Sequence, residues 1–337
     1  MTRATMMAVV LMLAGGCEKA GDSTEIEGSG ELSQVERQLF SLIPAGSNLV
    51  FGGNYQKLMK YWETSPLKKL GDSFTAATAP DQADGMRDYM ECWVEEQHAT
   101  DLAGALEVKP DAIGMIMVFR GVTEKTLTTC ADKGGLKYQR DADGKYIELS
   151  GLSNGMGGTA SVGYYFPAPD TAYFAFDLPL GMTPGVAPPP VGRAGIEARL
   201  AKAKSAPAAD DPKVRGLIAK ADRSKPFWFS GTAAGTPLAG KVGSGHGWLD
   251  ADATSLSFAF SVELSEAGAA SKAVSAFEEA KKSIDQLPSQ LKDAATAFLA
   301  DAKLTASGNT LNGRFRLTNE VLEKAAPALQ SVMGGVR

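Results

Sequence analysis

Three residues in the middle of the chain could form the triad of a serine hydrolase. Residues 151–155 match the G-x-S-x-G nucleophile motif around Ser153, and Asp177 and His246 follow in a triad order. That motif needs a strand before the serine and a helix after it, because the helix N-terminus and adjacent N–H groups hold the oxyanion. Here a strand-like run, residues 159–166, follows instead. An Asn-Gly turn between two strands explains the same residues, so we expect no catalytic residues and keep a hydrolase using Ser153 as an alternative.

Residues that could bind a metal ion or a dinucleotide lack the context that such sites require. Asp141-Ala142-Asp143-Gly144 begins like a calcium loop, but Lys145 follows and no glutamate stands at the twelfth place, which favours a hairpin turn. The chain has two histidines, and neither belongs to an HExxH motif or a cysteine cluster. Residues 155–160 match G-x-G-x-x-A, yet no helix opens there to hold a phosphate. We therefore expect no metal and no cofactor.

The N-terminus has the pattern of an export signal. Arg3 precedes an apolar run over residues 4–14, which is too short to span a bilayer comfortably. The run ends in Leu13-Ala14-Gly15-Gly16-Cys17, which resembles the lipobox of bacterial lipoproteins, with Ala14 at the place where these signals usually have Leu. The resemblance implies that residues 1–16 are removed and that Cys17 is lipidated. An ordinary signal peptide cut near Gly16 would instead leave Cys17 as a free thiol.

The residues after Cys17 predict a tether between a membrane and a folded domain. Residues 18–33 are polar, acidic and contain Gly and Ser, and such a segment reaches roughly 20 Å. Together with Cys17 they form the predicted tether, residues 17–33. Glu18 is not the aspartate that retains lipoproteins at the inner membrane, so the lipobox resemblance implies the periplasmic face of the outer membrane.

Export to an oxidising compartment predicts a disulfide between the two remaining cysteines, Cys92 and Cys130. Cys92 lies in an amphipathic helical pattern, and Cys130 lies on a shorter helix that Gly134 and Gly135 end. The alternative is a pair of buried free thiols. Neither cysteine belongs to a CxxC motif, so redox catalysis has no support.

Composition excludes several classes of protein. The chain has 337 residues, of which 44% are hydrophobic, and this length predicts roughly two domains. Lys and Arg number 34 against 39 Asp and Glu, for a net charge of -5, and the basic residues form no long run. Nucleic-acid binding needs a concentrated basic surface, so we expect no nucleic-acid partner.

Residues 34–177 are expected to form a first lobe that combines helices with an antiparallel sheet. Ser33-Gln34-Val35-Glu36 is a capping box that opens a helix, and a strand is predicted over 48–53. Residues 112–120 are apolar on both alternating faces, as in a central strand covered on both sides. Four strand-like runs between 136 and 176 predict an antiparallel meander.

Residues 178–192 are rich in Pro and Gly and mark a loop between this lobe and a second lobe, residues 193–337. The second lobe opens with two helical segments, and Asp211-Pro212 is a good start for the second of them. A strand, a hairpin, two helices, another hairpin and a terminal helix follow. The predicted class is therefore α+β, mostly antiparallel sheet with packed helices, with a faint internal duplication.

The second arm of the predicted hairpin, residues 255–264, has two contrasting faces. The serine-rich face is expected to meet water. The apolar face should be covered by the next helix through Val274, Phe277 and Ile284, which would make a packed core. The alternative is a cavity for an acyl chain, in which case the protein would carry an apolar ligand or a lipid. The apolar residues are Leu256, Phe258, Phe260, Val262 and Leu264.

Residues 43–50, Ile-Pro-Ala-Gly-Ser-Asn-Leu-Val, resemble a segment that leads into a strand in uncharacterised lipoproteins of Gram-negative bacteria. The resemblance covers short stretches and implies no catalytic residues. The sequence thus favours a lipid-anchored envelope protein that acts as a binding or interaction module without enzymatic activity. Its expected partners are the membrane, through the anchor, and a protein or apolar ligand.

Overall fold

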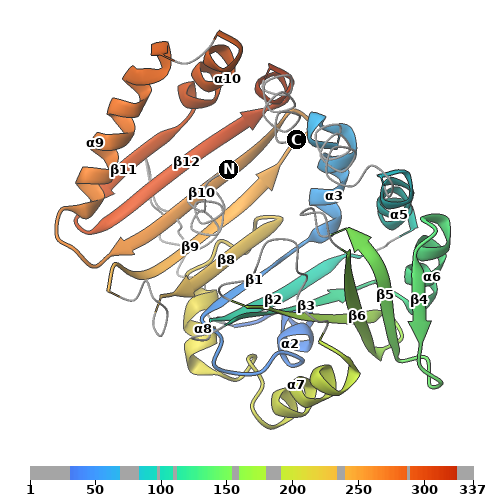
Figure 1. Ribbon diagram of the computed structural model, residues 1–337. Helices are drawn as coiled ribbons and strands as arrows, with labels where there is room; N and C mark the ends of the chain where they lie inside the picture. Colours follow the sequence, from blue (N-terminus) through green and yellow to red (C-terminus); the bar gives the residue numbers. More distant parts are fainter. Residues whose placement is uncertain are drawn as a thin grey trace.

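A twelve-stranded antiparallel sheet connects the two halves of the chain (Figure 1). The strand order is β11-β12-β10-β9-β8-β1-β2-β3-β7-β6-β5-β4. The computed structural model describes residues 31–68, 83–96, 99–108, 112–153, 159–179, 191–233, 240–286 and 289–324. Helices pack on both faces of the sheet, so the predicted α+β class is confirmed.

The strands are β1 (Leu49–Gly53), β2 (Asp101–Val108), β3 (Ala112–Arg120), β4 (Lys137–Arg140), β5 (Tyr146–Ser153), β6 (Thr159–Ala168), β7 (Thr171–Pro179), β8 (Phe227–Thr232), β9 (Val242–Ala251), β10 (Ser255–Leu264), β11 (Lys303–Ser307) and β12 (Thr310–Thr318). The helices are α2 (Gln34–Phe40), α3 (Tyr55–Thr64), α5 (Ala83–Glu96), α6 (Glu124–Lys133), α7 (Arg193–Ser205), α8 (Pro212–Ala219), α9 (Ala269–Lys282) and α10 (Ser289–Ala300), with a short 3₁₀ turn, η2 (Ser283–Gln286).

The helices α2 and α8 begin at the capping residues that the sequence predicts. The Ser33 hydroxyl accepts from the Glu36 N–H, and the Glu36 carboxylate accepts from the Ser33 N–H, which completes the capping box of α2. Asp211 caps α8 by accepting from the Lys213 N–H, with Pro212 at the first helical position. The predicted meander is β4 to β7, and β3 lies in the interior of the sheet between β2 and β7.

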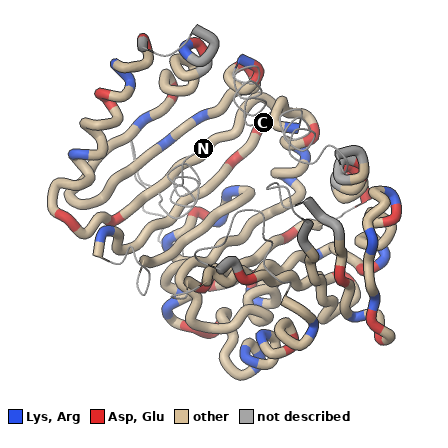
Figure 2. The backbone as a smooth tube through the Cα atoms, in the orientation of Figure 1, with Lys and Arg blue, Asp and Glu red and all other residues tan. Residues whose placement is uncertain are grey.

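The two faces of the sheet carry separate cores. On the first, which we call the α7 face, Val50, Val118 and Trp228 pack beneath α2, α7 and α8. On the opposite face, which we call the aromatic face, Phe51, Phe119 and Phe229 pack with residues of α5 and α6. α9 and α10 also lie on the aromatic face, where Phe277 and Phe298 contact Phe315 of β12. Lys and Arg are interspersed with Asp and Glu over the molecule (Figure 2).

The two halves of the sheet are related by an approximate two-fold rotation between β1 and β8. These strands pair antiparallel, with Phe51 opposite Phe229, Leu49 opposite Gly231 and Gly53 opposite Phe227, so their register is symmetric about the Phe51–Phe229 pair. In each half the first three strands are neighbours in chain order, and the last strand returns beside the third; the first half has in addition α3 and α5 between β1 and β2, and the strands β4 to β6. The faint duplication expected from the sequence is thus a repeat of topology.

The two repeats can be aligned residue by residue when the strand registers are followed outward on both sides of the Phe51–Phe229 pair. Phe51 pairs with Gly104 as Phe229 pairs with Gly247. The next strands continue the match, because Leu106 pairs with Met115 as Leu249 pairs with Phe258. Further equivalent positions are Ala105 and Trp248, Glu107 and Asp250, Gly114 and Ser257, Ile116 and Ala259, and Phe176 and Phe315.

The predicted boundary at residues 178–192 separates the strands of the two halves, but it does not separate their cores. Strands β1 to β7 lie on one side of the β1–β8 junction and β8 to β12 on the other. However, α7 and α8, which follow the boundary, pack on the α7 face with Val50 and Val118 of the first half. Residues 180–190 of the predicted loop lie outside the described residues. The two halves therefore share a core.

Candidate functional site

The structure does not assemble the predicted hydrolase triad. Ser153 ends β5 and pairs with Thr159 at the start of β6, so strands stand on both sides of the motif. Asp177 lies on β7 and is bound by Arg199. His246 lies on β9, and β8, β1, β2, β3, β7 and β6 separate that strand from β5. His246 therefore lies far across the sheet from Ser153, and the three residues do not form a triad.

The structure describes two of the three cysteine residues. Cys92 on α5 and Cys130 on α6 form the predicted disulfide, with their Cα atoms 5.2 Å apart. Both are buried in the core of the aromatic face. Cys17, the predicted lipidation site, lies outside the described residues, as do residues 1–16 and the tether up to residue 30. Among the described helices, none has the length and apolar character needed to cross a membrane.

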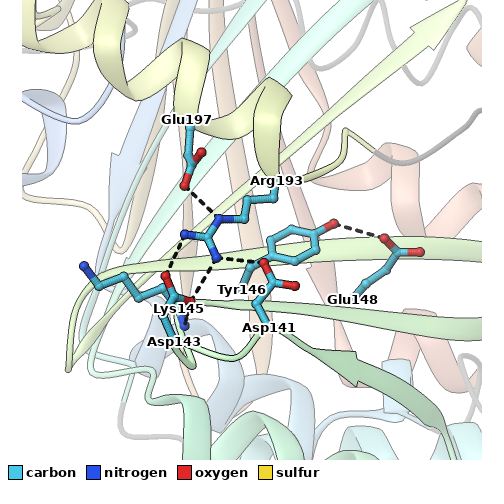
Figure 3. Close-up of polar contacts among 7 residues, drawn as sticks. All are labelled: Asp141, Asp143, Lys145, Tyr146, Glu148, Arg193 and Glu197. Carbon is cyan, nitrogen blue, oxygen red and sulfur yellow. Dashed lines mark hydrogen bonds and ion pairs between the residues drawn. The ribbon is translucent and has the colours of Figure 1, made fainter.

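The Asp141–Gly144 segment is a hairpin turn, as predicted, and a guanidinium group lies against its carboxylates (Figure 3). Arg193 Nη1 lies 2.7 Å from Asp141 Oδ2, and Arg193 Nη2 lies 2.6 Å from Asp143 Oδ2. Arg193 Nε bonds Glu197 one turn along α7 at 2.8 Å. We call these four residues the Arg193 clamp, because they fasten the start of α7 to the β4–β5 turn.

The clamp changes the acid–base behaviour of the turn. The hydrogen bond from Arg193 lowers the pKa of Asp143 to about 2, helped by the Lys145 N–H. The same carboxylates raise the pKa of Arg193, which stays charged. Within the described residues, no group of three or more His, Cys, Asp or Glu is arranged to hold a metal ion.

A cavity of about 310 Å³ lies beneath the middle of α7, between that helix, β2, β3 and the segment that leads into β1. One wall comes from Ala105 and Glu107 of β2, and Gly114 and Ile116 of β3 face it from the next strand. The remaining lining residues are Pro44, Ala45, Ser47, Ala198, Arg199 and Lys202. Polar and apolar groups make nearly equal contributions to the lining, and its cationic groups lie on α7.

Arg199 is held firmly at this site. Its Nη2 atom donates to both oxygens of Asp177, at 2.8 and 2.7 Å, and its side chain is 17% exposed. Its other terminal nitrogen, Nη1, is buried and has no hydrogen-bond partner. Lys202, three residues along α7, also lines the cavity, at an exposed position. Two cations at i and i+3 therefore face the same space.

A buried phenol lies near the guanidinium. Tyr173 is fully buried in the core of the α7 face, and its hydroxyl has no hydrogen-bond partner. Burial raises the pKa of Tyr173, and the charge of Arg199 opposes that shift. Tyr173 therefore stays neutral and adds no charge to the site.

One wall residue of the cavity is much smaller than its counterpart in the second repeat. Ala105 stands at the position equivalent to Trp248, whose ring packs against the core of the α7 face. The Lys225 ammonium lies 4.5 Å from the centre of that ring and also bonds Asp250 at 3.1 Å. Trp248 thus has contacts with the core and with Lys225 at the strand position where the first repeat has Ala105.

The aromatic face differs from the packed core that the sequence favours. α9 packs mainly over β11 and β12, so Phe277 contacts Phe315 at 6.4 Å between ring centres, while Phe258 and Phe260 stay partly exposed. Phe258 stacks on Phe229 at 6.2 Å and on Phe315 at 6.4 Å. The expected cover is thus displaced toward the sheet edge.

The other face of β10 also departs from expectation. Its serines were expected to meet water, but Ser255 and Ser261 are buried. The Ser255 hydroxyl donates to Asp252 and accepts from Arg316, and the Ser261 hydroxyl donates to Asn312 at 3.4 Å. The hydrogen bonds of these hydroxyl groups are therefore made with other side chains instead of with solvent.

Sequence reasoning did not identify Arg193, Arg199 or Lys202. On an isolated helix, they look like ordinary surface cations. Their roles depend on β2, β3 and the β4–β5 turn, which the fold brings beneath α7. A pattern of small residues in β2 would have been a signal, but the sequence analysis did not predict that strand.

Solved structures of TP0453 are among those that the chain resembles. Crystal form III of TP0453 has 10% sequence identity and a TM-score of 0.43, and the match covers 87% of this chain and 98% of that chain. Crystal form I of TP0453 has 11% identity and a TM-score of 0.41, covering 87% of this chain and 96% of that chain. No family model and no curated protein matches the chain.

Proposed function

We propose that this protein is a lipid-anchored protein of the cell envelope that binds a small ligand in the cavity beneath α7 and catalyses no reaction. The lipobox-like segment ending in Cys17 supports the anchor, and residues 18–33 support a flexible tether. The disulfide between Cys92 and Cys130 supports an oxidising compartment. The lipobox resemblance, with Glu18 after the cysteine instead of aspartate, favours the periplasmic face of the outer membrane.

The cavity carries the binding part of the proposal. A space of about 310 Å³ lies at the lower end of the range of small-molecule sites, and its lining combines apolar with polar groups in nearly equal parts. Arg199 is preorganised by Asp177, so little conformational freedom would be lost when a ligand binds. Trp248 stands at the strand position in the second repeat that Ala105 holds in the wall of the cavity.

A thermal-shift screen of small metabolites against the purified protein and its Ala105→Trp variant tests this site. Ligands that bind the folded state raise the melting temperature. We expect some compounds to stabilise the natural protein and not the variant, in which the introduced indole fills the cavity. Ala198→Phe, on the opposite wall, gives a second blocked form in case Ala105→Trp does not fold. Equal shifts in the natural protein and a folded blocked variant would place binding elsewhere.

Cell fractionation tests the anchor. The natural protein should be extracted from membranes with detergent, and Cys17→Ser should move it to the soluble periplasmic fraction. A Cys17→Ser protein that stays wholly with the membranes would rule out lipidation at this residue as the anchor.

A fluorophosphonate probe tests the absence of serine hydrolase activity. The distance in the sheet between β5 and β9 supports the expectation that the probe does not label the protein. Labelling that disappears in Ser153→Ala would make the hydrolase alternative correct.

A second candidate function is carriage of an acyl chain on the aromatic face. The partial exposure of Phe258 and Phe260 favours it, because α9 lies over β11 and β12 instead of over these rings. Carriage predicts a fatty acid or phospholipid in native mass spectra, lost in Phe258→Ala without a change in melting temperature. A packed core predicts no bound lipid and a loss of about 3 to 5 kcal/mol of stability in the same variant.

A further inference from the structure

We infer that the cavity beneath α7 takes a small zwitterion, a molecule with one carboxylate, one ammonium group and a short apolar part, of the chemical class of the free amino acids. This inference rests on the proposed binding function and specifies its ligand. It is carried by three features of the lining: the neutralisation of Arg199, the separate opposite charges of Lys202 and Glu107, and the small apolar residues of the remaining walls.

The charges around the cavity balance, so they favour a ligand without net charge. Arg199, Lys202 and Glu107 are the charged residues of the lining. Asp177 accepts two hydrogen bonds from Arg199 Nη2, at 2.8 and 2.7 Å, so this ion pair is neutral as a unit. One positive group, Lys202, and one negative group, Glu107, are left. A ligand that complements both of them carries both signs itself.

The two remaining charges come from different walls and do not neutralise each other. Lys202 belongs to α7 and Glu107 to β2, and both stand at exposed positions. Among the described residues, no ion pair joins Lys202 to Glu107 or to another carboxylate. Glu107 has an interaction elsewhere, but a carboxylate has about four acceptor sites and can accept from further donors. The cavity therefore offers a cationic donor on one wall and an anionic acceptor on the other.

The sheet register explains why Glu107 keeps its own charge in the lining. Glu107 pairs with Gly114, and Gly114 pairs with Asp177, so the two carboxylates share a face with a glycine between them. Their strands are two spacings apart, roughly 10 Å. Asp177 holds Arg199, and no ion pair joins Arg199 to Glu107. Glu107 is thus the carboxylate available to an ammonium group of a ligand.

The remaining walls suit a short apolar group. Ala105 and Ile116, which pair across β2 and β3, line the sheet side, and Ala198 lines the side of α7. Pro44 and Ala45 add apolar surface from the segment that leads into β1. A volume of about 310 Å³ has room for about ten water-sized groups, which is the size of an amino acid with an aliphatic side chain.

The experiment is calorimetric titration of the purified protein with L-leucine and 6-aminohexanoate, two isomers that hold their charges at different spacings. For each zwitterion, the N-acetyl form keeps only the carboxylate, and the amide form keeps only the ammonium group. Lys202→Gln and Glu107→Gln each remove one charge from the lining. Lys204→Gln and Glu263→Gln are the matched controls, because both residues are exposed and do not line the cavity. Melting temperatures of all four variants check that the fold is unchanged.

We expect at least one zwitterion to bind, and its N-acetyl and amide forms to bind about fivefold more weakly, as the loss of one partly exposed ion pair does. Lys202→Gln should abolish the advantage of the zwitterion over its amide form and keep its advantage over the N-acetyl form. Glu107→Gln should do the reverse, and the controls should behave like the natural protein. A general disturbance of the site would weaken all probes alike. The ratio between the two zwitterions identifies the spacing of the charges.

Equal binding of a zwitterion and its singly charged forms, the same probe preferences in Lys202→Gln and Glu107→Gln, or no binding of either zwitterion would overturn this inference. These outcomes differ from a failure of the proposed function. In that case no compound in the metabolite screen would depend on an open cavity, whereas here neutral or singly charged compounds would still bind and be lost in Ala105→Trp.

Discussion

At the scale of single residues, two glycines show how the repeats share one packing arrangement. Gly104 lies beneath the Phe51 ring, and Gly247 lies beneath the Phe229 ring. A Cβ on Gly247 would stand 2.5 Å from Phe229 Cζ, and a Cβ on Gly104 would overlap with the Phe51 ring. Each phenylalanine therefore needs the absence of a side chain on the neighbouring strand.

Gly104→Ala should lower the free energy of unfolding by about 1 to 3 kcal/mol, because the added methyl group must displace the Phe51 ring or the β3 backbone. Urea denaturation measures the change. Gly216→Ala is the control, since that glycine lies in the exposed part of α8 with nothing within 4 Å of an added Cβ. Alanine there should raise stability by about 0.5 to 1 kcal/mol. Equal effects of both substitutions would contradict the proposed packing.

The Arg193 clamp predicts acid sensitivity at another residue, Asp143. Its pKa falls from 3.8 to about 2 on folding, so the ionised form stabilises the folded state above pH 3.8. That contribution should disappear as the pH falls from about 4 to about 2. The melting temperature of Asp143→Asn should therefore fall less over this pH range than that of the natural protein. It should still fall in part, because the pKa of Asp252 is also about 2. An identical pH profile in the variant would show that the clamp contributes no stability.

The residues that sequence analysis identified correctly are those whose role depends on near neighbours. Ser33 and Glu36 are three positions apart, and Asp211 precedes Pro212, so their caps can be predicted locally. Arg193 and Arg199 have partners 52 and 22 residues away. No local pattern specifies such partners, which explains why the clamp and the cavity were not predicted.

At the scale of elements, strand and helix positions could be predicted better than their contacts. The meander β4 to β7 and the hairpin β9–β10 have alternating patterns bounded by turn residues. β2 was missed because its residues, Asp-Leu-Ala-Gly-Ala-Leu-Glu-Val, combine small side chains with a glycine, which is a weak strand signal. The displacement of α9 toward β11 depends on tertiary packing that periodicity does not encode.

The disulfide gives a prediction about two elements, α5 and α6. It closes a segment with a sequence separation of 38, for which loop entropy predicts a stabilisation of about 4 kcal/mol. A Cys92→Ala, Cys130→Ala double variant should therefore have a lower free energy of unfolding by about that amount, measured in urea. The natural protein, unfolded without reductant, should show no reactive thiol from these residues. One thiol label on each cysteine under those conditions would exclude the bond.

At the scale of the whole molecule, the repeat explains how one half of the sheet can be specialised. The two halves share the Phe–Gly arrangement at β1–β2 and β8–β9, which fixes their registers. On the α7 face, however, the first half has Ala105 and the second half has Trp248 at the equivalent position, where it packs against the core. The two halves therefore differ in side chains on this face while they share the pairing of the sheet.

The continuous sheet and the shared core of the α7 face predict that both halves unfold together. β1 pairs along its full length with β8, and α7 and α8 join residues of both halves in one hydrophobic core. Opening either half would expose Val50, Phe40 and Trp228, so partial unfolding costs nearly as much as global unfolding.

Hydrogen exchange detected by mass spectrometry tests this coupling, with Gly104→Ala as the perturbation. The substitution lies in β2 of the first half, but the slowest amides of β3 and of β10 should lose protection by the same free energy, equal to the loss measured in urea. A loss confined to β1 to β7 would mean that the second half opens independently of the first. In that case the β1–β8 junction would join two separate folding units, and the shared core would not couple them.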